Sequence, residues 1–185
     1  REFMSFEGQR WTYSETQTEI DRAARGLIAL GIEPGEKVSL WMTNQPEWVH
    51  IMFALAKIGA VMVPINTRLR TTDVEYIFHQ SDSTTILTME KSGPIRYLDM
   101  VLELCPELND QDRDGISFAG FPELKRVVSM GNQHPKGAYT WDEVQQMSDN
   151  VSQDDLKTRE RQVKPEDTVF IMYTSGTTGF PKGVV

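Results

Sequence analysis

The stretch VSLWMTNQPEWVHIMFALAKIGAVMV, residues 38–63, decides the fold class of this chain. Its first part, Val38 to Met42, is a short apolar run that is typical of a buried strand. Helical periodicity predicts a helix from Pro46 to Ile58, and Gly59 is placed to end it. The run from Ala60 to Val63 then predicts a second strand. A strand, a helix and a strand in this order indicate a parallel pair joined by a crossover helix.

The flanking sequence extends the same alternation of helices and strands. Two capping boxes, Thr12 with Glu15 and Thr72 with Glu75, predict the starts of further helices. Asn44 is expected to cap the central helix. We therefore predict an α/β fold with parallel-sheet layers and flanking helices. Ligands of such folds usually bind at the carboxyl ends of the strands.

The remaining predicted elements are shorter, and two polar, poorly periodic segments are expected to be surface loops. The predicted set comprises a hairpin of Arg1 to Phe6 and Arg10 to Tyr13 that turns at Gly8, strands at Thr84 to Thr88 and Arg126 to Met130, helices at Ile95 to Leu104 and Trp141 to Met147, and loops at Gln111 to Gly120 and Ser148 to Lys164.

Composition excludes several classes of protein. The chain has 185 residues, a net charge of -8 and one cysteine, Cys105, so it cannot form an intramolecular disulfide. The 19 lysines and arginines form no run, which argues against nucleic-acid binding. The three histidines have no carboxylate or cysteine at metal-ligand spacing, so we expect no metal held by protein side chains.

The sequence also predicts the compartment. The longest apolar stretch, Ile51 to Ile65, contains Lys57 and falls short of the ~20 residues that span a bilayer. Residues 1–13 lack the pattern of a signal peptide. With a single cysteine, the composition fits a reducing compartment, and a cytoplasmic location is expected. No transmembrane segment is predicted, and peripheral contact with a membrane stays open.

The segment that carries chemistry follows a predicted strand, Val169 to Tyr173. Residues 174–183, TSGTTGFPKG, contain three glycines, four hydroxyls and one lysine. Such a loop can turn backbone N–H groups toward one point and add hydroxyl and ammonium donors, which makes a phosphate cradle. Its spacing differs from a Walker A loop, since Pro181 precedes the lysine and Gly183 follows it. The residues after the loop predict a strand rather than a helix.

The segment YTSGTTGFPKG, residues 173–183, closely resembles the signature loop of the adenylate-forming enzymes, a superfamily of acyl-CoA synthetases, luciferases and peptide-synthetase adenylation domains. The resemblance continues upstream, where further sequence blocks match the family in the same order. These residues are most similar to those of medium- to long-chain fatty acyl-CoA synthetases. The matching blocks are WTYSE at residues 11–15, LGIEPGEKV at 30–38, NQPEW at 44–48, KIGAVMVPINTRLR at 57–70, PEL at 106–108 and PELKRVV at 122–128.

This resemblance implies an ATP-dependent ligase. By this resemblance, the parent protein would activate a carboxylic acid, most naturally a fatty acid, to an acyl-adenylate. It would then transfer the acyl group to coenzyme A, and Mg²⁺ would bridge the ATP phosphates. An aryl-CoA ligase, an adenylation domain and a non-catalytic interaction module remain alternatives. The ATP phosphates would be bound by Thr174, Ser175, Gly176, Thr177, Thr178, Gly179 and Lys182.

The resemblance also implies how much of such an enzyme this chain represents. Residues 1–185 would be a fragment of the large N-terminal domain that ends just after the phosphate loop, without the C-terminal domain. No complete set of catalytic groups is expected in it, so the fragment alone is expected to be inactive. The particular acid, the oligomeric state and the catalytic competence of the C-terminal region stay open.

Overall fold

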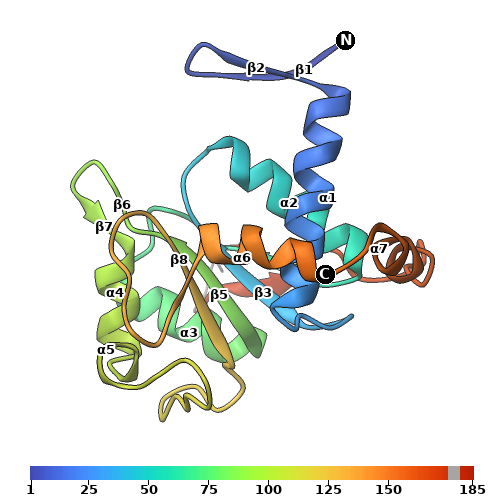
Figure 1. The fold of residues 1–185 in the computed structure, drawn as a ribbon. Helices are drawn as coiled ribbons and strands as arrows, with labels where there is room; N and C mark the ends of the chain where they lie inside the picture. The colour runs from blue at the N-terminus through green and yellow to red at the C-terminus, as the bar shows by residue number, and fades with distance from the viewer. Residues whose placement is uncertain (175–179) are drawn as a thin grey trace. The chain divides into compact units, whose positions relative to one another are not determined.

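The computed structural model describes residues 1–174 and 180–185. The chain divides into two compact units. Figure 1 draws their helices and strands as a ribbon. The first contains residues 1–35, 44–60 and 142–169, and the second contains residues 36–43, 61–141 and 170–185. Both units are assembled from segments that are far apart in the sequence, so neither is one continuous stretch of chain.

The first unit is mainly helical and begins with an antiparallel hairpin. The hairpin pairs β1 with β2, and its turn contains Glu7 and Gly8, both with positive φ, which confirms the turn expected at Gly8. The Thr12 and Glu15 capping box is also confirmed, because both of its hydrogen bonds are present. The elements of this unit are β1 (Glu2–Phe6), β2 (Gln9–Thr12), α1 (Tyr13–Ala29), α2 (Pro46–Ile58), α6 (Trp141–Met147), the 3-10 helix η1 (Ser148–Asn150) and α7 (Gln153–Glu160).

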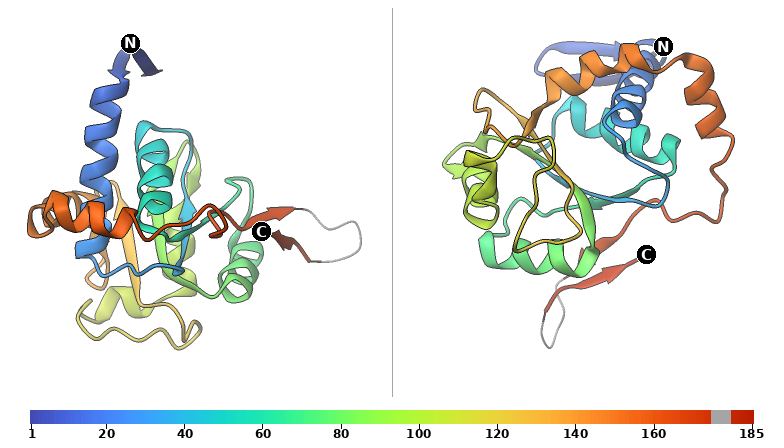
Figure 2. Two further views of the ribbon diagram at one scale, coloured as in Figure 1. Left: turned by 90° about the vertical axis from the view of Figure 1, so that its right-hand side faces the viewer. Right: turned by 60° about the horizontal axis from the view of Figure 1, so that its bottom comes forward.

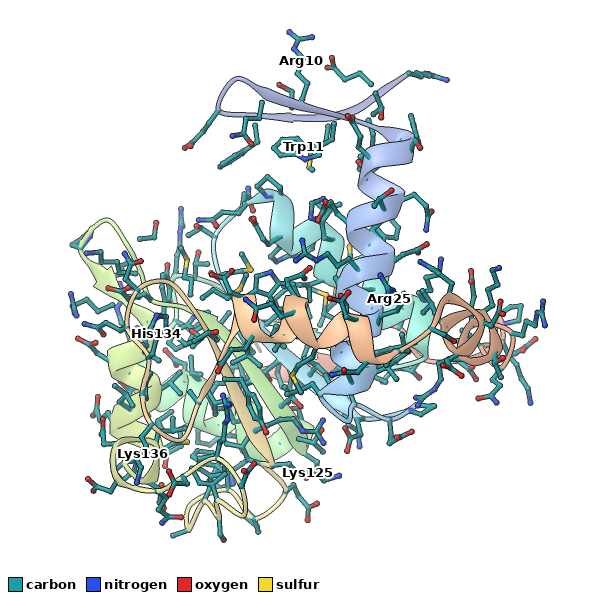
Figure 3. The ribbon with its side chains drawn as sticks, in the orientation of Figure 1. Arg10, Trp11, Arg25, Lys125, His134 and Lys136 are labelled. Carbon is teal, nitrogen blue, oxygen red and sulfur yellow. The ribbon has the colours of Figure 1, made fainter. Side chains whose placement is uncertain are left out.

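Helix α1 has close contacts on two sides within this unit. It packs against α2, and its Ala23, Ala24 and Leu27 side chains are fully buried. Gly26 faces α6 so closely that a Cβ added to it would lie 2.3 Å from the Val144 carbonyl oxygen. The neighbouring Arg25, labelled in Figure 3, donates Nη1 hydrogen bonds to backbone oxygens that follow α6. A small residue at position 26 is therefore required for this helix packing.

Two predictions for the first unit are wrong. Helix α2 has Gln45 rather than Asn44 at its N-cap, and no side chain caps it; Pro46 takes the first helical position, where its missing N–H costs nothing. Its end is as predicted, since Gly59 adopts a left-handed φ of 76°. The expected loop at Ser148 to Lys164 contains η1 and α7 instead.

The second unit is built on a five-stranded sheet with the order β4-β3-β5-β8-β9, and all of its pairs are parallel. This confirms the predicted α/β class with a parallel sheet and flanking helices. The elements of this unit are β3 (Lys37–Trp41), β4 (Val61–Pro64), α3 (Thr71–Ser81), β5 (Ser83–Met89), β6 (Lys91–Ser92), β7 (Ile95–Arg96), α4 (Tyr97–Leu104), α5 (Glu107–Asp110), β8 (Arg126–Met130), β9 (Tyr139–Thr140), β10 (Met172–Thr174) and β11 (Lys182–Val184).

Strand β5 forms the centre of the sheet and is buried along its whole length. Its polar groups are satisfied: the Ser83 hydroxyl lies 2.7 Å from the hydroxyls of both Ser39 and Ser81. Next to these buried hydroxyls, the Glu36 carboxylate forms ion pairs with Lys125, which is labelled in Figure 3, and with Arg126 at 3.2 Å. These contacts join residues at the amino ends of β3, β5 and β8.

Two helix starts in this unit also differ from the prediction. Helix α3 begins at Thr71, and the Asp73 carboxylate accepts a hydrogen bond from the Arg70 amide, so the expected box of Thr72 and Glu75 is wrong. Helix α4 begins at Tyr97 because Ile95 is part of β7. Residues 111–120 are turns and irregular backbone, as predicted. Among the described residues no helix has the length and apolarity needed to cross a membrane.

Candidate functional site

The candidate site is the ribbon of β10 and β11, which flanks the predicted phosphate loop. The chain enters it along β4: Phe170 forms a parallel bridge with Met62, and the Ile171 amide donates to the Met62 carbonyl oxygen at 3.0 Å. Strand β10 follows at once and pairs with β11 in antiparallel fashion. Figure 2 shows this ribbon extending from the second unit. The strand predicted after the loop is therefore confirmed, and the site is unlike a Walker loop.

The register of the ribbon places the two terminal site residues opposite one another. Thr174 is paired with Lys182, and Tyr173 is paired with Gly183. Because directly opposite residues of an antiparallel pair project from the same face, the Thr174 hydroxyl and the Lys182 ammonium share one face of the ribbon. Both residues are exposed. Two positively polarised donors, an O–H and an N–H₃⁺, are thus presented to the same side.

The opposite face of the ribbon carries Tyr173 and Gly183. A Cβ added to Gly183 would lie 3.2 Å from the Tyr173 Cζ atom and 3.0 Å from the Ile171 Cγ2 atom. The absence of a side chain at Gly183 therefore leaves room for the tyrosine ring. One glycine of the motif thus has a packing role as well as any role in binding an anion.

Helix α3 contacts the segment at two points, one in β10 and one just before β11. The Tyr173 hydroxyl donates a hydrogen bond to the Gln80 side-chain oxygen. The Phe180 ring stacks on Tyr76, with ring centroids 4.8 Å apart and planes inclined by 18°. Sequence reasoning missed Tyr76 and Gln80, because they lie about a hundred residues before the motif and nothing in their local pattern marks them.

The Tyr173 phenol is a stable donor at neutral pH. Partial burial, with a smaller contribution from the nearby Tyr76 and Asp82, raises the pKa of Tyr173 to about 12. Ionisation of the phenol would place a negative charge beside these groups, which disfavours it. The hydrogen bond to Gln80 therefore persists through the pH range in which most enzymes work.

The structure places two of the seven predicted phosphate-binding residues, Thr174 and Lys182, and brings them together. The other five, Ser175, Gly176, Thr177, Thr178 and Gly179, lie outside the described residues. Among the residues that are described, no group of three or more histidine, cysteine or acidic side chains could hold a metal ion.

Cys105 has no part in this site. It is the residue that ends α4, and its side chain is fully buried. Burial, assisted by the charge of Glu107, raises the pKa of Cys105 to about 12. Since the thiolate is the reactive form, this cysteine is inert in the folded protein, as expected from its apolar surroundings.

Comparison with protein families finds one match that spans the chain. The family described as "AMP-binding enzyme" matches residues 1–185. A putative acyl-CoA synthetase, YngI of Bacillus subtilis, is 35% identical over 176 residues. The mitochondrial medium-chain acyl-CoA ligase ACSF2 of Danio rerio is 31% identical over 185 residues. These alignments cover 95% and 99% of this chain but only 32% and 30% of the relatives, so the chain spans about a third of their length.

Solved structures agree with this fold. The inhibitor-bound N-terminal domain of FACL13 from Mycobacterium tuberculosis is 30% identical, with a TM-score of 0.60, and the match covers 96% of this chain and 37% of that one. The anthranilate CoA ligase AuaEII in complex with anthranoyl-AMP has a TM-score of 0.73. That match covers all of this chain and 31% of the other, at 23% identity, and therefore supports the fold alone.

Proposed function

Because the chain belongs to the AMP-binding enzyme family, we propose that the whole protein activates a carboxylic acid with ATP and transfers the acyl group to coenzyme A. The observation that carries this proposal is the ribbon that presents Thr174 and Lys182 on one face at the two ends of the signature loop. The named functions of YngI and ACSF2 support the same reaction.

The proposed reaction has two steps. An oxygen of the acid's carboxylate attacks the α-phosphorus of ATP, and the bond to the bridging oxygen breaks to release pyrophosphate. The thiol of coenzyme A, after losing its proton, then attacks the acyl carbon and displaces AMP. Charge accumulates on the leaving pyrophosphate during the first step, so groups that bind its oxygens accelerate that step.

Thr174 and Lys182 fit this role. A hydroxyl and an ammonium on one face can both donate hydrogen bonds to the oxygens of the β- and γ-phosphates. By resemblance, Ser175, Gly176, Thr177, Thr178 and Gly179 complete the set of donors. By the same resemblance, we propose that Mg²⁺ bridges the phosphates and neutralises part of their charge.

A fatty acid is the proposed substrate class. ACSF2 is named as a medium-chain ligase, and the chain is 29% identical to a solved structure named as a fatty acyl-CoA synthetase of Mycobacterium tuberculosis. An aryl acid is the second candidate. Residues beyond this chain are expected to set the choice between them.

We also propose that residues 1–185 form a fragment of a large N-terminal domain, without the C-terminal domain. The match to the N-terminal domain of FACL13, which covers 96% of this chain and 37% of that one, supports this assignment. A cytoplasmic location is proposed from the single cysteine, whereas the ACSF2 relatives are named as mitochondrial. Fractionation of cells that express the tagged whole protein would distinguish these two compartments.

The test is acid-dependent exchange of pyrophosphate into ATP by the whole protein. Octanoate, laurate, palmitate, benzoate and anthranilate form a suitable panel, and thioester formation is then measured with coenzyme A. We expect the fatty acids to support both steps. Exchange only with the aromatic acids would favour an aryl-CoA ligase, and no exchange with any acid would favour a non-catalytic module.

A further inference from the structure

Two side chains of α3 contact the chain next to the ends of the β10 and β11 ribbon. Tyr76 and Gln80 are four residues apart and therefore lie on the same face of the helix. Gln80 accepts the hydrogen bond from Tyr173, directly before Thr174. Tyr76 stacks on Phe180, two residues before Lys182. The helix thus contacts the chain at both ends of the loop.

We propose that Tyr76 and Gln80 are positioning residues that fix Thr174 and Lys182 for the phosphates of ATP. This inference rests on the proposed function and adds two residues to it. Neither Tyr76 nor Gln80 is proposed to touch the nucleotide. They act through Phe180, two residues before Lys182, and through Tyr173, directly before Thr174.

The geometry of the ribbon explains how the contact of Tyr173 with α3 can position the donors of Thr174 and Lys182 on the opposite face. Tyr173 alternates with Thr174 along β10, so holding Tyr173 against Gln80 of α3 turns Thr174, and Lys182 paired with it, away from the helix. Because Gly183 has no side chain, there is room for the Tyr173 ring beside it. The free face is left open to a ligand.

A short ribbon needs such an anchor. Each strand has three residues, and an isolated two-stranded hairpin of this size is at best marginally stable in water. Outside its contacts with α3 it is largely exposed: Met172 is 55% and Val184 is 53% accessible. Besides the bridge of Phe170 to Met62 of β4, its orientation therefore depends on the stack and the hydrogen bond.

The expected effects are moderate because Phe180 is 70% exposed. An aromatic pair of this kind contributes enough to change a binding constant by about three- to tenfold. We expect Tyr76→Ala to raise the KM for ATP in the exchange reaction by that factor. Thioester formation from supplied acyl-adenylate should change by less than about twofold, because pyrophosphate has already left.

Four variants of the whole protein test the inference. Tyr76→Ala removes the stack, while Tyr76→Phe retains it and should restore the wild-type KM. Gln80→Ala changes an exposed side chain, so the protein should fold, and it should also raise the KM. Glu75→Ala, at an exposed neighbouring position on α3, is the matched control and should leave the KM unchanged.

A double-mutant cycle and hydrogen exchange complete the experiment. If Tyr76 acts through Phe180, then Tyr76→Ala should add nothing in a Phe180→Ala background. Backbone amides of residues 172–174 and 182–184 should exchange faster in Tyr76→Ala, while those of β5 stay unchanged. This readout needs no substrate, so it tests the anchor apart from catalysis.

The outcomes separate the two proposals. An active wild type with an unchanged KM in Tyr76→Ala and Gln80→Ala would overturn the positioning role alone. Unchanged exchange of the ribbon amides, or additive effects in the double mutant, would also overturn it. If the wild type forms no acyl-adenylate with any acid, the proposed function fails, and the positioning role fails with it.

Discussion

Lys182 is the residue whose replacement tests the proposed chemistry most directly. A charged hydrogen bond to phosphate contributes about 1.5 to 3 kcal/mol, and it should strengthen as charge develops on pyrophosphate. We expect Lys182→Ala in the whole protein to slow acyl-adenylate formation by about one to two powers of ten at saturating ATP. Single-turnover measurement of the first step gives this rate.

The second step provides the internal control for Lys182. Thioester formation from supplied acyl-adenylate should be nearly unaffected in Lys182→Ala, because no pyrophosphate is present. Lys164→Ala, which removes an exposed lysine elsewhere, should leave both steps unchanged. Equal damage to both steps in Lys182→Ala would contradict a role confined to the leaving phosphates.

Cys105 offers a residue-scale measure of unfolding. With its pKa raised to about 12, the thiol should react very slowly with an aromatic disulfide reagent at pH near 8. In denaturant the thiol becomes accessible, its pKa returns toward about 8.5, and labelling should be fast. The rate of labelling, measured at increasing concentrations of denaturant, reports the unfolding of the protein around Cys105. Fast labelling of the native protein would show that α4 opens locally.

At the scale of single elements, the close contact of α1 with α6 predicts that one added methyl group destabilises the fold. Gly26→Ala places a Cβ 2.3 Å from the Val144 carbonyl oxygen, and this oxygen is part of a helix backbone that cannot move alone. We expect a loss of about 1 to 3 kcal/mol in the free energy of unfolding, measured with urea.

Gly120→Ala is the matched control for that change. Its nearest neighbour would be the Leu104 carbonyl oxygen at 3.9 Å, an ordinary contact. We expect its effect on the free energy of unfolding to stay within about 0.5 kcal/mol. If both substitutions cost the same, the close approach of α1 and α6 does not limit the size of residue 26.

The start of α1 predicts a dependence on pH. The Thr12 amide donates to Glu15 at 2.8 Å, and this bond and the one from the Thr12 hydroxyl hold the pKa of Glu15 below its ordinary value of 4.5. A carboxyl whose pKa is lowered on folding stabilises the fold above its unfolded pKa, and this stabilisation is lost as the pH falls through the folded pKa.

Thr12→Ala should therefore cost about 1 kcal/mol at neutral pH, the usual value for a lost N-cap. The difference from wild type should shrink in acid, below the ordinary pKa of Glu15, where the wild type loses its own charged cap. Urea unfolding at neutral pH and at about pH 3 measures both values. Thr18→Ala, at an exposed position within α1, should show no such change with pH.

Elements with strong local signals could be predicted from the sequence. Strand β8 and helix α6 have the predicted bounds, because an apolar run and helical periodicity mark them. Helix α7 could not be found in that way, since Leu156 is its only buried residue and its remaining face is polar. Its cap was nonetheless visible, because Ser152 and Asp155 form a capping box with aspartate in place of glutamate.

At the scale of the whole molecule, the parallel sheet was predictable and the anchoring of the site was not. The order of strands and helices between Val38 and Thr88 determines a parallel sheet through local rules. The contacts of Tyr76 with Phe180 and of Gln80 with Tyr173 join residues about a hundred positions apart. Such pairings follow from tertiary packing, which no local pattern in one sequence encodes.

The extent of the chain leads to a prediction about activity. Since it spans about a third of the length of YngI and ACSF2, we expect the 185-residue polypeptide alone to catalyse no ATP-pyrophosphate exchange. Its affinity for ATP should be weaker than micromolar, which calorimetry can measure. Exchange above background with any fatty acid would contradict this expectation and would locate a sufficient catalytic set within these residues.

The pairing of Thr174 with Lys182 has a consequence in polymer terms. It joins the two ends of the seven residues 175–181, so that folding itself closes this stretch into a ring. The entropy of ring closure depends only logarithmically on the number of residues enclosed. Lengthening the stretch by a residue or two should therefore weaken anion binding only slightly. Breaking the ribbon should weaken it much more, because the entropy of closing the loop would then be lost when the anion binds.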